Sequence, residues 1–168
     1  MAASNPPIMF SNEEYEIRAA KNVDEFREEW WRHMQILGWN RGYHDLNTYM
    51  DCSEGSGMLL LIHKASTKIV GMVCAVVYPN STGWLSFFIV DAEHRRKRMG
   101  AELFKWAMAD FERHGTKIVG LDGVAEQKAT YERRGYVDSP LGTVKLMARP
   151  LVEKLSLGDV ADLAVSCA

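Results

Sequence analysis

The fold is decided by the apolar run Trp84-Leu85-Ser86-Phe87-Phe88-Ile89-Val90, which continues as Asp91-Ala92-Glu93-His94 and then as Arg95-Arg96-Lys97-Arg98-Met99-Gly100. Such an apolar run is typical of a strand covered on both faces, and we expect it to be the central strand of a sheet. From Ala101 onward, apolar residues recur at helical spacing: Leu103, Phe104, Ala107, Met108 and Phe111. The sequence therefore predicts a strand that leads through a basic loop into a helix.

This junction predicts an anion site. Where a strand runs directly into a helix, several free backbone N–H groups and the positive helix end face one place. The macrodipole adds only ~0.3–1 kcal/mol, whereas each charge-assisted hydrogen bond can add ~1.5–3 kcal/mol, so the arginines and amides would dominate binding. A polyphosphate is the expected ligand. From the residues alone, a solvated surface turn and a nuclear-localisation or nucleic-acid patch stay open.

The rest of the chain alternates between strand and helix patterns. Strands are predicted at residues 15–20, 58–63, 69–78, 117–121 and 143–147. Helices are predicted at residues 22–38 and 126–134, with a shorter helix or irregular cover at 42–54. Glycines at 38, 115 and 135 mark helix ends. This order, without an internal repeat, indicates an α+β or α/β domain with one twisted sheet.

The composition is that of one globular domain. The 168 residues carry 20 Lys+Arg against 22 Asp+Glu, a net charge of -2, so any basic site must be local. The apolar runs are far shorter than the ~20 residues that span a bilayer, and no secretory signal precedes them. We expect a cytoplasmic location, with a nuclear one also open. The three cysteines lack metal-ligand spacing, which predicts reduced thiols and no metal.

Residues 84–137 resemble the acyl-CoA-binding half of the GNAT superfamily of N-acetyltransferases. The family's pyrophosphate motif, Gln/Arg-x-x-Gly-x-Gly/Ala, is matched at Arg95 and Gly100, although Arg98 replaces its first glycine. The later stretch Ala129-Thr130-Tyr131-Glu132-Arg133-Arg134-Gly135-Tyr136 resembles the family's Tyr-Glu-x-x-Gly-Phe signature. The resemblance implies an α/β (α+β) fold with a mixed, mostly antiparallel central sheet flanked by helices.

The resemblance also implies a domain organisation. We expect a flexible N-terminus at residues 1–13, the N-acetyltransferase domain at 14–150 and a tail or linker at 151–168. The stretch Val119-Gly120-Leu121-Asp122-Gly123-Val124 further resembles a subgroup with a second acyltransferase-like domain, which would begin after Leu151.

The implied activity is transfer of an acetyl group from acetyl-CoA to an amine by direct attack. Thioester and pantetheine would bind the backbone of three strand residues: Phe88, Ile89 and Val90. Pyrophosphate would bind the loop, mainly through its amides: Arg95, Arg96, Lys97, Arg98, Met99, Gly100 and Ala101. Tyr131 matches the family tyrosine that lies near the CoA sulfur and can protonate the leaving thiolate.

The base and the acceptor are less defined. Trp84 stands where several family members have a glutamate, which leaves Asp122 as the candidate base, or Ser86 to orient a water. In the first helices, Trp31, Trp39 and Tyr43 are either core residues or the lining of an acceptor pocket.

We expect a small-molecule or peptide amine as the partner, no nucleic acid or membrane, and a monomer or homodimer. A non-catalytic acyl-CoA sensor or interaction module of the same fold is the alternative, and nucleic-acid binding ranks third.

Overall fold

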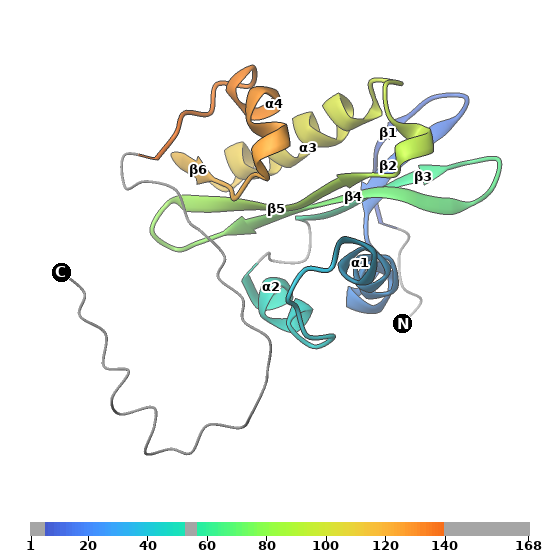
Figure 1. Ribbon diagram of the computed structural model, residues 1–168, viewed down its shortest axis with the longest axis horizontal. Coiled ribbons are helices and arrows are strands. Elements are labelled where there is room, and N and C mark those ends of the chain that lie inside the picture. The colour runs from blue at the N-terminus through green and yellow to red at the C-terminus, as the bar shows by residue number, and fades with distance from the viewer. Residues whose placement is uncertain (1–5, 53–56, 140–168) are drawn as a thin grey trace, which may run out of the picture. The chain divides into compact units, whose positions relative to one another are not determined.

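The structure is a computed structural model that describes residues 6–52 and 57–139. The chain divides into two compact units, Met1–Val124 and Ala125–Ala168, and each is described by itself. The first unit contains one six-stranded sheet in which sequential strands are also spatial neighbours (Figure 1). Its strands are β1 (Ile8–Ser11), β2 (Tyr15–Ala19), β3 (Met58–His63), β4 (Lys68–Val77), β5 (Thr82–Val90) and β6 (Ile118–Gly120).

The sheet is mostly antiparallel. Each of the first five strands pairs antiparallel with the next strand in the sequence, with a helical segment between β2 and β3, and β6 pairs in parallel with β5. A crossover helix precedes β6, as a parallel pair requires. The predicted mixed α/β fold with a mostly antiparallel sheet flanked by helices is therefore confirmed.

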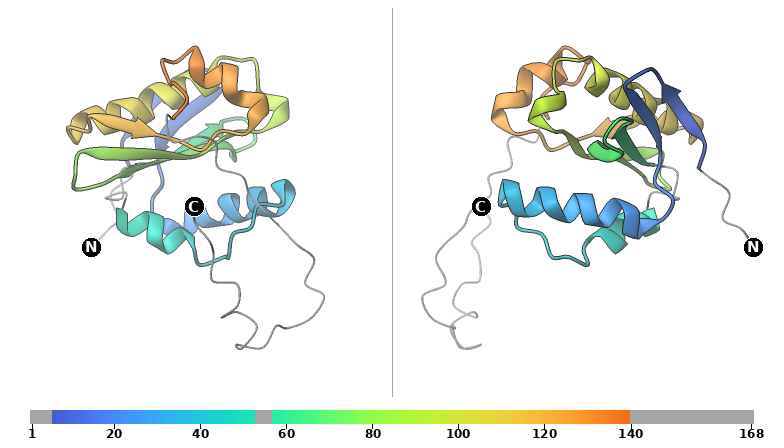
Figure 2. Two further views of the ribbon diagram at one scale, coloured as in Figure 1. Left: turned by 60° about the vertical axis from the view of Figure 1, so that its left-hand side comes forward. Right: turned by 90° about the vertical axis from the view of Figure 1, so that its right-hand side faces the viewer.

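Helices cover both faces of the sheet (Figure 2). Helices α1 (Val23–Leu37) and α2 (Leu46–Cys52) lie on one face, and α3 (Met99–Arg113) lies on the other. The predicted limits of α1 hold, because Asn22 Oδ1 accepts from the amide of Glu25 at 2.9 Å and Gly38 ends the helix at φ 63°. Both signals are local and need no tertiary contact.

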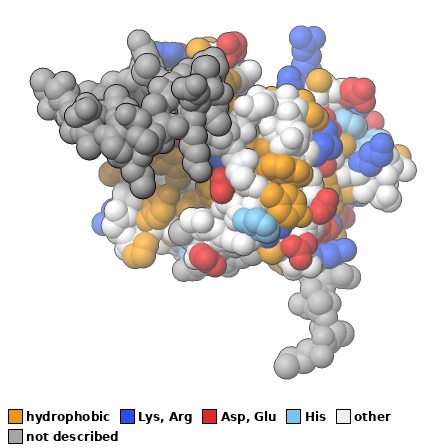
Figure 3. Space-filling view, turned by 60° about the horizontal axis from the view of Figure 1, so that its bottom comes forward, with side chains coloured by type: hydrophobic (Ala, Val, Ile, Leu, Met, Phe, Trp, Pro, Cys, Tyr) orange, Lys and Arg blue, Asp and Glu red, His pale blue; other side chains and the backbone are white. Residues whose placement is uncertain are grey.

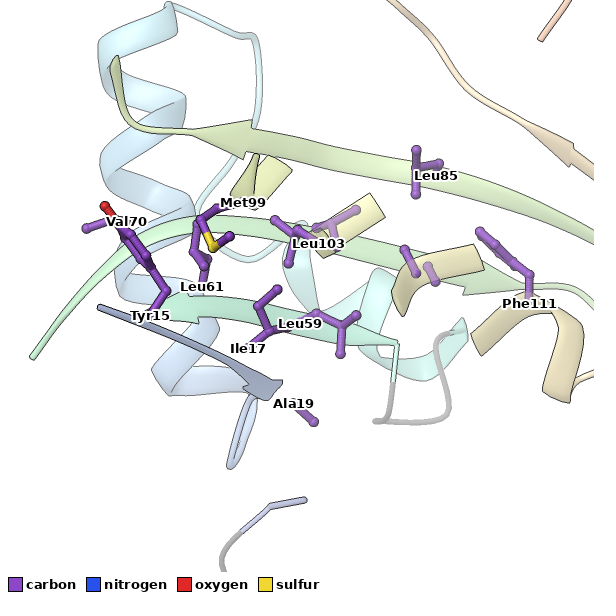
Figure 4. Close-up of a cluster of buried hydrophobic side chains, with 13 residues drawn as sticks. Tyr15, Ile17, Ala19, Leu59, Leu61, Val70, Leu85, Met99, Leu103 and Phe111 are labelled. Atoms are coloured by element: carbon purple, nitrogen blue, oxygen red, sulfur yellow. The ribbon is translucent and has the colours of Figure 1, made fainter. Parts of the chain in front are cut away.

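Two hydrophobic clusters join these layers. Under α3, side chains from β2 and β3 meet Met99, Leu103 and Phe111 of the helix (Figure 4). On the opposite face, Phe26 and Trp30 of α1 pack with Leu46 of α2 against the sheet, and all three are fully buried. Burying an aromatic or aliphatic side chain of this size contributes ~1.5–3 kcal/mol, so these clusters fix both helix layers to the strands between them.

The expectation that residues 84–90 form the central strand is wrong, although side chains of β5 do pack on both faces of the sheet. Strand β4 has that position: residues 70–76 are all buried, and β4 pairs with a strand on each side. In β5, burial alternates up to Phe87 and then declines. The reason is that β6 pairs with only three residues of β5, so much of one β5 edge has no strand beside it in the described part of the chain.

Outside the central strands, the structure differs from the sequence prediction at two places. Residues 8–11 form β1, paired with β2, although the sequence placed a flexible segment through residue 13. A segment of four residues shows too little periodicity for a strand to be predicted from it, and pairing with β2 determines this strand.

In the second unit, the predicted helix is shorter: a 3-10 turn, η2 (Ala125–Gln127), is followed by α4 (Lys128–Glu132). The strand expected at 143–147 and the tail at 151–168 lie outside the described residues.

None of the helices in the described segments combines the length and the apolar character needed to cross a membrane.

Candidate functional site

Strand β5 contains a β-bulge at its middle. Met72 pairs with Ile89 and Cys74 pairs with Ser86, so Phe87 and Phe88 together oppose a single residue of β4. Phe87 has φ 53°, a left-handed conformation that costs a non-glycine residue ~1–2 kcal/mol. Strain of this kind persists only where the surroundings impose it, and it is concentrated at functional sites.

The bulge changes which side chains share a face. Phe87 points into the α1–α2 cluster, where its ring centroid lies 5.7 Å from that of Trp30 and 4.7 Å from that of Tyr49. Phe88 and Val90 pack against the cluster under α3. Their side chains are therefore part of the protein core, and the Val90 carbonyl accepts from Arg95 Nε at 2.8 Å.

Beyond the bulge, the outer edge of β5 is open. Pairing with β6 ends at Trp84 opposite Gly120, and no described strand continues it toward Val90. An unpaired strand edge presents N–H and C=O groups to an extended, amide-containing ligand. A short 3-10 turn connects the end of this strand to the basic loop at residues 95–98.

The basic loop directs a series of free amides at one place. After the 3-10 turn η1 (Ala92–His94), Arg96 and Arg98 take φ 65° and 64°, and α3 begins at Met99. In the described part of the chain, the amides of residues 96–100 donate to no acceptor. Because they precede a 15-residue helix, the helix dipole adds to them, and the geometry suits an anion.

The four basic side chains of this loop divide into two pairs. Arg95 Nε donates to the carbonyl of Val90 at 2.8 Å, and Lys97 lies 3.7 Å from a carboxylate oxygen of Glu14. Arg96 and Arg98 are exposed and make no ion pair within residues 6–52 and 57–139. Of the predicted phosphate ligands, these two have side chains available for a ligand.

Gly100 lies at the first turn of α3. A Cβ there would be 3.6 Å from Val90 Cγ2 and 3.7 Å from the Phe88 ring, which is ordinary contact. The space at this position therefore accepts a glycine or an alanine, as the predicted motif requires. A larger side chain would extend beside Phe88 and Val90.

The loop is held at its start by α1. Arg32 binds both carboxylate oxygens of Asp91 at 2.9 and 3.0 Å, and buried His33 has Nε2 at 3.1 Å from Glu29 Oε1. Burial alone would raise the pKa of Glu29, but hydrogen bonds from His33 and Arg32 outweigh it and lower that pKa.

Glu29, His33 and Asp91 have ligand atoms within 4.8 Å of one another, the spacing of a metal site. Arg32 contacts both carboxylates, so we interpret the group as an ion-pair network that ties α1 to the end of β5.

The two predicted catalytic residues lie in different units. Asp122 is exposed and follows β6 in the first unit. Tyr131 belongs to α4 in the second unit, where its ring centroid lies 6.2 Å from that of Tyr136 in an edge-on arrangement. Burial raises the pKa of the Tyr131 hydroxyl above its ordinary value, and the nearby charge of Arg134 opposes that effect.

The predicted acceptor residues pack on the α1–α2 side, whose exposed hydrophobic and charged side chains are seen in Figure 3. The rings of Trp31 and Tyr43 meet edge-on at 5.5 Å, and Arg27 lies 5.2 Å from the Tyr43 ring centroid. Trp39 is 39% exposed. Trp31 and Tyr43 therefore fasten the loop after α1 onto that helix.

A hollow of about 310 Å³ is lined by the segment after α1, by α2 and by the end of β4 with the residue that follows it. Its residues are Arg41, Asp45, Thr48, Tyr49, Val76 and Tyr78. Tyr49 connects the hollow to the bulge, because its ring contacts Phe87. Tyr49 lies in α2, and no signal in the sequence linked it to β5.

A family model described as "Acetyltransferase (GNAT) family" matches residues 23–136. Among solved structures, glucosamine-6-phosphate N-acetyltransferase from Arabidopsis thaliana is similar, with 18% identity over 81% of this chain and 100% of that one and a TM-score of 0.61. Ard1 from Thermoplasma volcanium has 16% identity over 75% of this chain and 84% of that one, with a TM-score of 0.64.

A probable acetyltransferase from Staphylococcus aureus has 9% identity over 80% of this chain and 99% of that one, with a TM-score of 0.62. No curated protein sequence gives a significant match. The family model covers well over half of the chain and includes both β5 and the basic loop. The chain belongs to the acetyltransferase (GNAT) family.

Proposed function

We propose that this protein transfers an acetyl group from acetyl-CoA to an amine by direct attack on the thioester. One observation carries the proposal: the open edge of β5 is followed, after the 3-10 turn η1, by the free amides of residues 96–100. Pantetheine, an extended chain with two amides, matches the first feature, and a pyrophosphate matches the second. A single ligand with both parts would bind along this line.

The residues present suit such a ligand. The backbone of Phe88, Ile89 and Val90 is the proposed binding strand for the thioester and pantetheine, and the amides of residues 96–100 are the proposed pyrophosphate cradle. Arg96 and Arg98 add exposed cations beside that cradle. Charge-assisted hydrogen bonds of ~1.5–3 kcal/mol each would supply a large part of the ~8 kcal/mol that micromolar binding needs.

The proposed role of Tyr131 is to donate a hydrogen bond to the departing thiolate. With ordinary pKa values of ~10 for tyrosine and ~8.5 for a thiol, complete proton transfer is already uphill by ~2 kcal/mol. The raised pKa of Tyr131 makes complete transfer still less favourable. It also keeps the hydroxyl protonated at neutral pH, so the proton is available for donation.

The amine must lose a proton before or during the attack. An alkylamine of pKa ~10.4 is almost wholly protonated at neutral pH, a cost of ~4–5 kcal/mol. Asp122 is the carboxylate that we propose as the base, and its exposure suits an acceptor that arrives from solvent. Ser86, half-buried in β5 next to the bulge, is positioned to orient a water as a relay.

The hollow beside Tyr49 is the proposed entry of the acceptor, because Tyr49 links it to the bulge at Phe87. Arg41 lines this hollow and makes no ion pair within the described residues. An unpaired guanidinium favours an acceptor that carries a carboxylate or phosphate in addition to its amine.

A non-catalytic acyl-CoA sensor is the second candidate. It is favoured by Trp84, which occupies the position of a family glutamate and leaves no acidic side chain at that point of β5. Thiol release from acetyl-CoA that depends on an added amine supports the enzyme, with amines that bear a carboxylate reacting fastest. Binding of acetyl-CoA with no thiol release across the whole amine panel supports the sensor.

A further inference from the structure

The basic loop is attached to β2 by a buried tyrosine. Tyr15 is 1% exposed, and its hydroxyl lies 2.8 Å from Nδ1 of His94. Lys97 Nζ lies 5.5 Å from the centroid of the Tyr15 ring. The nearby Tyr15 and the charge of Glu14, which lies 3.7 Å from Lys97 Nζ, together raise the pKa of Lys97. Residues 94 and 97, on either side of the strained Arg96, are therefore held by one side chain.

One hydrogen bond and one cation–ring contact join the three residues. The Tyr15 hydroxyl and Nδ1 of His94 share the hydrogen bond, and an Nδ1 without a proton accepts the Tyr15 O–H. Lys97 adds a cation above the face of the Tyr15 ring.

The loop needs such support. Arg96 and Arg98 both have positive φ, and each costs ~1–2 kcal/mol relative to ordinary backbone conformations. No side chain caps the start of α3, and the amides of residues 96–100 have no acceptor in the described segments. A loop with this strain and few internal hydrogen bonds keeps one conformation only if outside contacts impose it.

We propose that Tyr15, His94 and Lys97 form an anchor that holds residues 95–100 in the phosphate-binding conformation. Tyr15 and His94 are then positioning residues for acyl-CoA. They act through the loop and need not touch the ligand. This inference rests on the proposed function, since it assigns the loop to the phosphates of acetyl-CoA.

His94 has a second ring neighbour. The ring of His63, at the end of β3, lies 5.0 Å from the His94 ring between centroids. The loop is therefore attached to β3 as well as to β2.

The test compares Tyr15→Phe, His94→Leu and His94→Gln, with His44→Gln as a control on an exposed histidine. Calorimetry with acetyl-CoA should show about tenfold weaker binding for Tyr15→Phe and His94→Leu, the loss expected for one buried hydrogen bond. His94→Gln can still accept from Tyr15 through its side-chain carbonyl oxygen, so it should retain most of the affinity. His44→Gln should match the wild type.

A second measurement distinguishes loss of the anchor from a general loss of enzyme activity. With S-acetylpantetheine, a donor that lacks the pyrophosphate, kcat/KM should be unchanged in Tyr15→Phe, while KM for acetyl-CoA rises. Equal losses with both donors, or unchanged acetyl-CoA affinity in a folded Tyr15→Phe variant, would overturn the anchor. A wild-type protein that binds no acetyl-CoA would overturn the proposed function itself.

Discussion

The indole of Trp84 lies directly over the backbone of Gly120, so that a Cβ at residue 120 would sit 2.4 Å from Trp84 Cζ3. The two residues are also partners in the parallel pairing of β5 and β6, and they form its last pair before the open edge. The position of Trp84 thus depends on the absence of a side chain opposite it. This contact defines where the edge available to a ligand begins.

Gly120→Ala should therefore destabilise the protein. The new methyl group must displace the Trp84 indole or separate β5 from β6, and overpacking of this kind costs ~1–3 kcal/mol. Chemical denaturation measures the loss in the free energy of unfolding. Gly120→Ala combined with Trp84→Leu provides the matched control, because the smaller side chain makes room and should recover part of the loss. Full stability of Gly120→Ala alone would contradict the contact.

Arg98→Gly should change stability and affinity in opposite directions. Arg98 holds φ 64° at the start of α3, which glycine adopts without strain, so the free energy of unfolding should rise by ~0.5–1 kcal/mol. Removal of the cation should weaken acetyl-CoA binding about tenfold. Arg98→Gln keeps the strained backbone and removes the charge, so it should lose affinity without gaining stability. Thermal melting and calorimetry on both variants distinguish the two effects.

Tyr131→Phe should lower kcat by about 10²-fold, the usual scale for loss of a proton donor, with acetyl-CoA affinity nearly kept. The wild-type hydroxyl should keep its contribution up to pH 10.0, because burial raises the pKa of Tyr131 above that ordinary value. Steady-state kinetics across the alkaline range measure both effects. Full turnover in the variant would remove Tyr131 from the mechanism.

Glu29→Gln should reduce stability at neutral pH, with a deficit that shrinks on acidification. The pKa of Glu29 in the folded protein lies below its ordinary value of 4.5. A group with a lowered folded pKa stabilises fully above its unfolded pKa and loses that effect as pH falls through the folded value. Unfolding curves of wild type and variant at several pH values measure this, with exposed Glu112→Gln as the control. A deficit that grew toward acid pH would contradict the assignment.

Features set by local chemistry were predictable from the sequence. The cap at Asn22, the end of α1 at Gly38 and the strand-loop-helix order around residues 84–113 depend on short-range interactions and were confirmed. The position of β1 and the central place of β4 depend on strand pairing, which a single sequence specifies weakly.

In the candidate site, too, the local motif was predictable from the sequence and the tertiary contacts were not. The motif at Arg95 and Gly100 located the basic loop, but nothing in it indicated that Lys97 turns toward Tyr15 and Arg95 toward Val90. The bulge at Phe87 could not be predicted from the sequence either. A glycine often indicates a positive φ, but the residue with positive φ here is a phenylalanine. The cytoplasmic location, the acceptor identity and the roles of Asp122 and Tyr131 stay predictions.

The central claim is tested most directly by calorimetric titration of the protein with acetyl-CoA, with ATP as the control ligand and Gly100→Asp as the control variant. The account predicts one-to-one binding of acetyl-CoA, much weaker binding of ATP, and loss of acetyl-CoA binding in Gly100→Asp, whose carboxylate would crowd and repel the pyrophosphate at the start of α3. Absence of wild-type binding at millimolar acetyl-CoA, or equal affinity in the variant, would contradict it.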